Sequence, residues 1–303
     1  MLGKGPKAAN KPDFFILGAA KSGTTSLYHY LGQHPEVFMS PVKEPSFFSE
    51  GFQVVTSAVT YFRLFDGVGC EKRIGEASHV YLTNPSTAGV LKALFPTARF
   101  VVVLRNPADR AYSLYHHMRR NGYEWAGSFE KALELEQWRW RSERFRRTCP
   151  QYFYNFLYFR SGLYGQQLER YFSLFDETQF HVLTLDELNS DPVGSLRDIL
   201  EFLDVDPHFS PTFRVHNEGA RTALVPELQY FFRSKVTRPR LLKRLGWSVV
   251  RRVNRMKIPP IRAETREALL RRYASDLERL AELTGIRFQQ PSNASSGELP
   301  DAA

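Results

Sequence analysis

Short apolar runs alternate with longer segments of helical periodicity along most of this chain. The run Phe100–Leu104 predicts a central strand, because it is apolar at every position instead of alternating. Strands that alternate with helices form βαβ units, so the pattern predicts an α/β fold in which helices flank a parallel β-sheet. The expected strands are Phe14–Leu17, Arg73–Glu76, Arg99–Leu104 and Gln179–Leu185. The expected helices are Ser86–Leu94, Pro107–Arg120, Phe129–Arg147, Leu163–Phe175, Pro192–Leu203 and Glu264–Leu283.

The pattern weakens at both ends of the 303-residue sequence. Residues 1–12 are charged and contain proline and glycine, and residues 290–303 are mostly small and polar. Such segments cannot bury enough apolar surface to order themselves, so we expect a disordered leader and a flexible tail. The intervening residues 13–289 show no internal repeat, and we expect them to form a single domain.

A glycine-rich loop follows the first expected strand and leads into a helical pattern. Gly18 and Gly23 enclose four residues, the spacing of a nucleotide-phosphate loop, and the hydroxyls of Thr24 and Thr25 follow directly. Loop N–H groups and the positive end of a helix dipole together favour a bound phosphate. An NTPase loop would carry lysine where Thr24 lies, whereas this chain has Lys21 inside the loop. The alternative is an ordinary turn between strand and helix with Lys21 in solvent.

A second candidate for anion binding stands at the end of the expected central strand. Arg105 follows that strand at the carboxyl edge, where open α/β sheets bind their ligands. Asn106 and Pro107 suit the N-cap and the first position of the next helix. Arg105 offers a forked donor suited to phosphate, and Ser113 on the helix can add a hydroxyl. The alternative is a capped helix whose arginines pair with Asp109 or with solvent.

Charge and cysteine content narrow the partners and the compartment. A net charge of +9 predicts an anionic partner, although nucleic acid, acidic lipid, acidic glycan and a phosphorylated cofactor all fit it. Cys70 and Cys149 show neither a CxxC motif nor a metal-ligand spacing, which indicates a reducing compartment. We find no apolar signal region and no stretch long enough to span a membrane, so we expect a protein of the cytoplasm.

Two basic stretches are candidates for contacts with a partner. Residues Trp138–Arg147 interleave tryptophan with arginine, which suits stacking on sugars or on single-stranded nucleic acid. We favour instead an amphipathic helix with its tryptophans packed inward. Residues Arg233–Arg262 are basic and amphipathic and could lie on an anionic membrane surface. We favour a segment that covers the domain or a dimer partner, which leaves both peripheral membrane contact and a homodimer open.

Together the two phosphate motifs resemble those of the sulfotransferase superfamily, whose members use 3′-phosphoadenosine 5′-phosphosulfate (PAPS). The likeness is closest to the heparan sulfate-type branch and its bacterial relatives, and it covers about residues 13–205 well. It implies a P-loop-like fold similar to that of nucleotide kinases. Further shared motifs are His34-Pro35, Lys43-Glu44-Pro45-x-Phe47-Phe48, Gly75-Glu76-Ala77-Ser78-x-x-Tyr81, Tyr164-x-x-Gln167-Leu168 and Asp186-Glu187-Leu188.

The resemblance implies a role for each residue of the two phosphate motifs. Lys21 would contact the bridging oxygen of the phosphosulfate and stabilise charge as the sulfuryl group leaves. Arg105 and Ser113 would hold the 3′-phosphate, the group that separates PAPS from ADP. This scheme requires no metal ion. The residues that would hold the 5′-phosphate are Ser22, Gly23, Thr24 and Thr25.

The resemblance also implies a base for the acceptor hydroxyl. Glu44 matches the catalytic glutamate of the heparan sulfate branch, and the following Pro45 favours an extended backbone there; the alternative is a solvated loop glutamate. That branch carries a lysine where this chain has Ala77, so His79, two places on, is a second proton-handling candidate. A lone histidine is more often structural, which ranks His79 below Glu44. Residues Asn217–Arg221 match the family's adenine loop poorly.

We therefore expect an enzyme that moves a sulfuryl group from PAPS to a hydroxyl or amine of a carbohydrate, lipid or small molecule, with no specific nucleic-acid partner. A P-loop kinase is the first rival, but it needs a Mg²⁺ site and a lysine after Gly23, and the lysine is missing. A basic nucleic-acid-binding module is the second rival. It predicts salt-sensitive binding of oligonucleotides and gives no use to Lys21.

Overall fold

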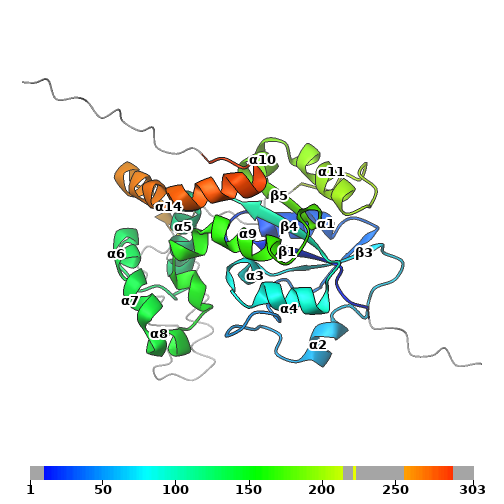
Figure 1. Ribbon diagram of the computed structural model, residues 1–303, viewed down its shortest axis with the longest axis horizontal. Helices are drawn as coiled ribbons and strands as arrows, with labels where there is room; N and C mark the ends of the chain where they lie inside the picture. The colour runs from blue at the N-terminus through cyan, green and yellow to red at the C-terminus, as the bar shows by residue number, and fades with distance from the viewer. Residues whose placement is uncertain (1–9, 214–220, 223–255, 289–303) are drawn as a thin grey trace, which may run out of the picture.

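The structure, a computed structural model, describes residues 10–213, 221–222 and 256–288. Its centre is a five-stranded sheet in the order β2-β3-β1-β4-β5, and every neighbouring pair of strands is parallel (Figure 1). The expected α/β fold with a parallel sheet is confirmed. The strands are β1 (Phe14–Gly18), β2 (Val37–Met39), β3 (Arg73–Ala77), β4 (Arg99–Leu104) and β5 (Phe180–Thr184), and β6 (Arg221–Thr222) pairs antiparallel with β7 (Met256–Lys257).

Both faces of the central strands are covered. Every residue of β1 is buried, with Phe15 and Leu17 in one hydrophobic core and Phe14 and Ile16 in the other. Because successive side chains of a strand point to opposite faces, a strand between two cores must be apolar throughout. That requirement explains the uninterrupted apolar runs of β1 and β4.

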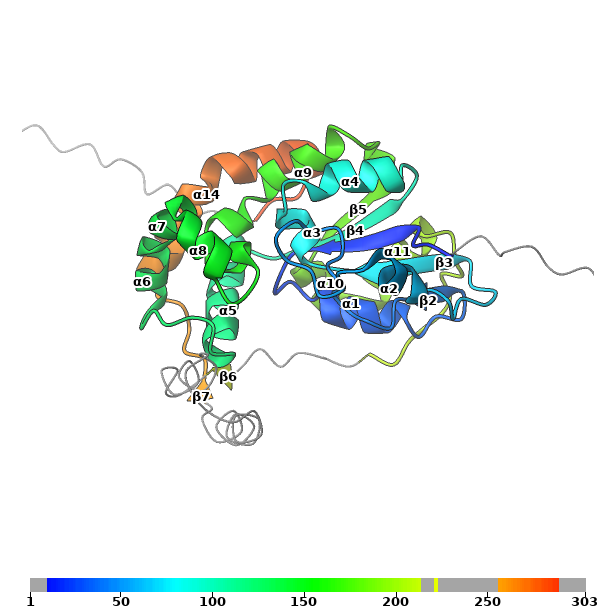
Figure 2. The ribbon, with the colours of Figure 1, turned by 90° about the horizontal axis from the view of Figure 1, so that it is seen from below.

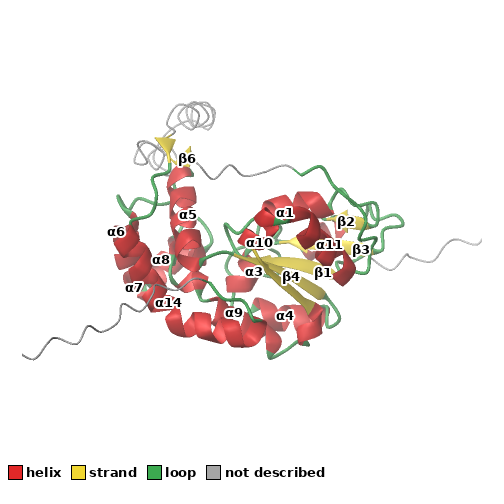
Figure 3. Ribbon diagram, turned by 90° about the horizontal axis from the view of Figure 1, so that it is seen from above, coloured by secondary structure: helices red, strands yellow, loops and turns green. Residues whose placement is uncertain are grey.

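The helices divide between the two faces of the sheet (Figure 3). One face is covered by α1 (Thr24–Leu31), α10 (Leu185–Ser190) and α11 (Pro192–Phe202). The other face is covered by α3 (Val80–Thr83), α4 (Thr87–Leu94), α5 (Pro107–Arg120), α9 (Tyr164–Phe172) and the long α14 (Ala263–Thr284). Asp276 of α14 accepts hydrogen bonds from the backbone N–H groups of Gly165 and Gln166, which joins α14 to the first turn of α9.

The hydrophobic pattern did not predict several short elements, and one long expected helix is wrong. Residues 129–148 form three helices. Leu135 separates the first from the second, and the third begins after Ser142, whose hydroxyl accepts from the N–H of Phe145. Similarly, the last expected strand ends at Thr184, whose hydroxyl caps α10. The three helices are α6 (Phe129–Glu134), α7 (Glu136–Arg141) and α8 (Glu143–Thr148). The remaining elements are α2 (Ala58–Arg63), η1 (Phe153–Phe156), η2 (Arg160–Gly162) and η3 (Glu177–Gln179).

The α6–α8 group lies beside α5, at the end of the molecule away from β2 and β3 (Figure 2). The expectation that its tryptophans pack inward is wrong for Trp138, whose exposed fraction is 54%. Arg139 is buried instead, with both terminal nitrogens 2.7 Å from the carboxylate of Glu124. Tyr158 donates to the same carboxylate at 2.7 Å. This buried ion pair sets which face of α7 turns inward.

The expected leader, tail and Arg233–Arg262 segment lie largely outside the described residues, so their assignment stays a prediction. Within the described ranges, each helix is too short or too polar to cross a lipid bilayer.

Removal of Glu124 tests how far the α6–α8 group depends on this ion pair. Glu124→Ala leaves a guanidinium buried without its counter-charge, and we expect a loss of about 3–5 kcal/mol in the free energy of unfolding. Glu134→Ala is the control, since it breaks an exposed pair with Lys131 worth about 0–1 kcal/mol. Urea denaturation measures both values, and equal losses would contradict a structural role for the buried pair.

Candidate active site

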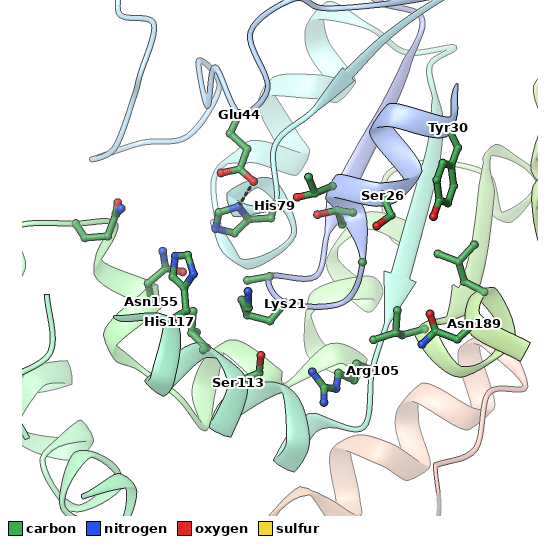
Figure 4. Close-up of a pocket in the computed structure, with 18 residues that line it drawn as sticks. Lys21, Ser26, Tyr30, Glu44, His79, Arg105, Ser113, His117, Asn155 and Asn189 are labelled. Atoms are coloured by element: carbon green, nitrogen blue, oxygen red, sulfur yellow. Dashed lines mark ion pairs between the residues drawn. The ribbon is translucent and has the colours of Figure 1, made fainter. Parts of the chain in front are cut away.

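Each strand of the sheet delivers one segment to the same edge. Parallel strands have their carboxyl ends at a common edge of the sheet. Ligands bind at this edge where the connections from neighbouring strands run in opposite directions, which here is beside β1. A cavity of about 360 Å³ lies at this point (Figure 4). Its lining residues come from the segments that follow β1, β2, β3, β4 and β5, namely Lys21, Glu44, His79, Arg105 and Leu185 respectively.

The loop after β1 leads directly into α1. Gly23 precedes the helix with a φ of 91°, a left-handed conformation that favours glycine, and a Cβ there would lie 2.8 Å from Leu185 Cδ1. No side chain caps the first turn of α1, and that turn holds no acidic residue. Its free N–H groups and the helix dipole are therefore available to an anion. Thr24 and Thr25 line the cavity, whereas the Ser22 side chain is fully buried and does not.

Lys21 reaches the cavity from the middle of this loop. Its backbone is also left-handed, with a φ of 68°. Burial, together with the nearby Arg120 and Arg105, lowers the pKa of Lys21 to about 8, against an opposing effect of Glu44. A cation held among other cations gains most from a bound anion.

The opposite wall of the cavity is formed by the end of β4 and by α5. Asn106 caps α5 by accepting from two backbone N–H groups, which places Arg105 and Ser113 on the cavity. Arg110, which shares a face with Ser113, has another role. It is fully buried and donates to the backbone oxygen of Tyr158 at 2.6 Å, so it anchors α5.

Glu44 and His79 meet on the third wall. His79 Nδ1 lies 3.0 Å from Glu44 Oε1 (Figure 4). Lys43 Nζ lies 2.5 Å from the same oxygen. Burial alone would raise the pKa of Glu44, but His79 and Lys43 hold it well below its usual range. Because a carboxylate only accepts hydrogen bonds, Nδ1 of His79 carries the hydrogen in this contact.

The backbone of Glu44 is not extended, contrary to the expectation from the following proline. Its φ is 64°, a region that non-glycine residues seldom occupy. The N–H of Glu44 donates to the Ala77 oxygen at 2.9 Å, at the end of β3, and this bond overrides the local preference. Unfavourable backbone conformations held by the surroundings are concentrated at functional sites.

A family model described as the sulfotransferase domain matches residues 11–218. The chain belongs to the sulfotransferase family. The two phosphate motifs were therefore assigned to the right superfamily, and the P-loop-like fold is confirmed together with it. Neither rival class, a kinase or a nucleic-acid-binding module, is needed to explain this sulfotransferase domain.

Individual relatives support the same family. A sulfotransferase of known structure from Alicyclobacillus acidocaldarius is 31% identical, with a TM-score of 0.70 over 92% of this chain and 98% of that chain. The human bifunctional heparan sulfate N-deacetylase/N-sulfotransferase 2 is 30% identical over 66% of this chain. The membrane-associated sulfotransferase kil1 of Dictyostelium discoideum is 24% identical over 64% of this chain. The matches span only 23% and 56% of those two relatives.

His117 of this sulfotransferase lines the cavity, although the sequence alone indicated a packing or surface residue. His117 lies four residues after Ser113 and so shares its helix face, a signal that would have found it. The amide nitrogen of Asn121 lies 3.2 Å from His117 Nε2 and donates to it, so Nδ1 carries the hydrogen. Burial lowers the pKa of His117 to about 3, helped by Lys21, so the ring is neutral.

Three other lining residues carried no recognisable signal in the sequence, namely Gln151 and Asn155 from the segment after α8 and Asn189 from α10. Leu188 of α10 also lines the cavity, and it belongs to the shared motif Asp186-Glu187-Leu188. The weak adenine candidate cannot be placed, since residues 217–220 lie outside the described part of the chain.

Proposed function

We propose that this chain transfers a sulfuryl group from PAPS to a hydroxyl or amine of a carbohydrate, lipid or small-molecule acceptor. The observation that carries the proposal is a single cavity with Lys21 and the α1 N-terminus on one wall and Arg105 with Ser113 on another. These are cations, hydroxyls and N–H donors, the groups that suit phosphate and sulfate oxygens. Family membership implies PAPS as the co-substrate.

Each donor has a task in this scheme. Arg105 and Ser113 bind the 3′-phosphate, and Lys21 offsets the negative charge that grows on the leaving oxygen. The Ser22 side chain takes no part, because it is fully buried and does not line the cavity. The residues that bind the 5′-phosphate are Gly23, Thr24 and Thr25 together with the first N–H groups of α1.

Two routes exist for the acceptor proton. Glu44 accepts it directly, the role that the resemblance assigns, or His79 accepts it at Nε2 while Glu44 holds the Nδ1 hydrogen. An efficient base has a pKa near the working pH, and the lowered pKa of Glu44 disfavours the direct route. We therefore propose that Glu44 and His79 act as one unit in which His79 receives the proton.

The acceptor class, the cytoplasmic location, peripheral membrane contact through residues 233–262 and a homodimer stay predictions. The relative from Dictyostelium is named as membrane-associated, which keeps the peripheral contact open.

Arg105→Ala tests the 3′-phosphate site. Wild-type protein should bind 3′,5′-ADP much more tightly than 5′-ADP in calorimetry without added Mg²⁺. The variant should lose about 1.5–3 kcal/mol of 3′,5′-ADP binding, the value of a charged hydrogen bond. Its affinity for 5′-ADP is the internal control and should not change. Equal affinities of wild-type protein for both nucleotides would exclude a 3′-phosphate site.

Lys21 is tested by transfer of ³⁵S from labelled PAPS to a metabolite extract. Lys21→Ala should lower kcat by more than it weakens PAPS binding, because charge builds beside it only as sulfur leaves. Only the protonated lysine offsets that charge, so kcat/KM for PAPS should fall as pH rises through about 8. Lys21→Arg should move this fall to higher pH, since arginine stays charged. A wild-type protein that labels no product contradicts the proposed function.

The base is identified by comparing two variants in the same assay. If His79 receives the proton, His79→Ala should lose about 10²–10⁴-fold in kcat, the usual contribution of a general base. Glu44→Gln should then lose less, because the amide oxygen still accepts the Nδ1 hydrogen. An inactive Glu44→Gln beside a nearly active His79→Ala would assign the proton to Glu44. Binding of 3′,5′-ADP is the control for correct folding in both.

A further inference from the structure

A second glutamate, which has no part in the scheme above, lies beneath the catalytic pair. Glu76 of β3 is fully buried, and its carboxylate accepts from the Ser78 hydroxyl at 2.5 Å, Tyr61 at 2.8 Å and Tyr81 at 3.0 Å. Burial raises the pKa of Glu76 to about 7, and the same three hydroxyls oppose that rise. A buried carboxylate that accepts three hydrogen bonds fixes the positions of the three donor side chains and of the groups bonded to them.

Two of the three hydroxyls also accept hydrogen bonds from the backbone of the loop that carries Glu44. The N–H of Ser46 donates to the Ser78 hydroxyl at 3.0 Å, which in turn donates to Glu76. The N–H of Phe48 donates to the Tyr81 hydroxyl at 3.3 Å, which donates to the other carboxylate oxygen. We call each of these paths, from loop amide through hydroxyl to carboxylate, a relay. Both relays end on one side chain.

The loop needs such anchors because its backbone is unfavourable. Glu44 and Ser46 both have positive φ, at 64° and 52°, which costs free energy in residues with a Cβ. Three N–H groups of this stretch are bound to β3 or to the segment that follows it: that of Glu44 through the Ala77 oxygen, and those of Ser46 and Phe48 through the two relays. Ser78 also directly precedes His79, so the first relay ties down both members of the catalytic pair.

We propose that Glu76 is a positioning residue that holds the Lys43–Phe48 loop, and thereby Glu44, in contact with His79. This inference rests on the proposed function, since the loop matters for turnover only if the pair handles the acceptor proton. Glu76 is not among the residues that line the cavity, and its hydrogen-bonded connection to the loop backbone runs through the Ser78 and Tyr81 relays. The nucleotide-binding walls, formed after β1 and β4, do not depend on it.

The test compares three hydroxyl deletions around the one carboxylate. Ser78→Ala and Tyr81→Phe each cut one relay, whereas Tyr61→Phe removes a donor to Glu76 and leaves both relays intact. The rings are kept in the tyrosine variants, including the stacking of Tyr61 on Phe47. Tyr61→Phe is thus a matched control for the loss of one hydrogen bond to the buried carboxylate.

The 303-residue variants are assayed by ³⁵S transfer from PAPS to a metabolite extract, by calorimetry with 3′,5′-ADP and by amide hydrogen exchange. We expect Ser78→Ala and Tyr81→Phe to transfer label about 10–100-fold more slowly at saturating PAPS, the effect of a small misplacement of catalytic groups. Affinity for 3′,5′-ADP should not change, and exchange should accelerate at Ser46 and Phe48 respectively. Tyr61→Phe should match wild-type protein in all three measurements.

Two outcomes would overturn the positioning role. One is wild-type turnover in both relay variants, and the other is an equal loss of turnover in Tyr61→Phe, which would indicate general destabilisation. A wild-type protein that transfers no label contradicts the proposed function instead. In that case the exchange rates at Ser46 and Phe48 still decide whether the relays anchor the loop.

Discussion

The site depends on the position of β1 at the centre of a parallel sheet. With β3 on one side and β4 on the other, the loop after β1 lies between the segments that follow both neighbours. Covering both faces of β1 requires five apolar or small residues in succession, and the chain must then turn within the Gly18–Gly23 loop to start α1. The buried core therefore fixes where the N–H donors of α1 point, and the other strands bring their side chains to that place.

The charges at this edge are arranged for an anion. Lys21 is partly desolvated and lies near Arg105 and Arg120, which repel it and lower its pKa. Glu44, the carboxylate that opposes this lowering, is already engaged by Lys43 and His79. A bound dianion relieves this repulsion, and a ligand that binds only the folded state stabilises it by mass action. The electrostatics thus separate the cavity into a cationic part, to which we assign the donor, and the Glu44–His79 part, to which we assign the acceptor proton.

Features that depend only on residues close together in the sequence could be predicted from it. The bounds of α5 agree at both ends, because Asn106 and Pro107 are a local start signal. The loop with Lys21 and the pair Arg105 and Ser113 are also local patterns, and the structure brings them to one cavity. Where an outcome depended on a distant partner, the prediction failed. The inward face of α7 is set by Glu124, fifteen residues before Arg139, and not by the hydrophobicity of its tryptophans.

The contact between Glu44 and His79 shows why contacts between distant residues cannot be predicted from the sequence. Glu44 and His79 follow different strands, and each alone has a plausible structural interpretation. They meet only because β2 pairs with β3 and because the loop after β2 adopts a left-handed backbone against the local preference of a residue before proline. That backbone is in turn held by Ser78 and Tyr81 through a buried carboxylate. The motif Gly75–Tyr81 carries part of the family resemblance, and in the structure it supplies the hydrogen-bonding network beneath the contact between Glu44 and His79.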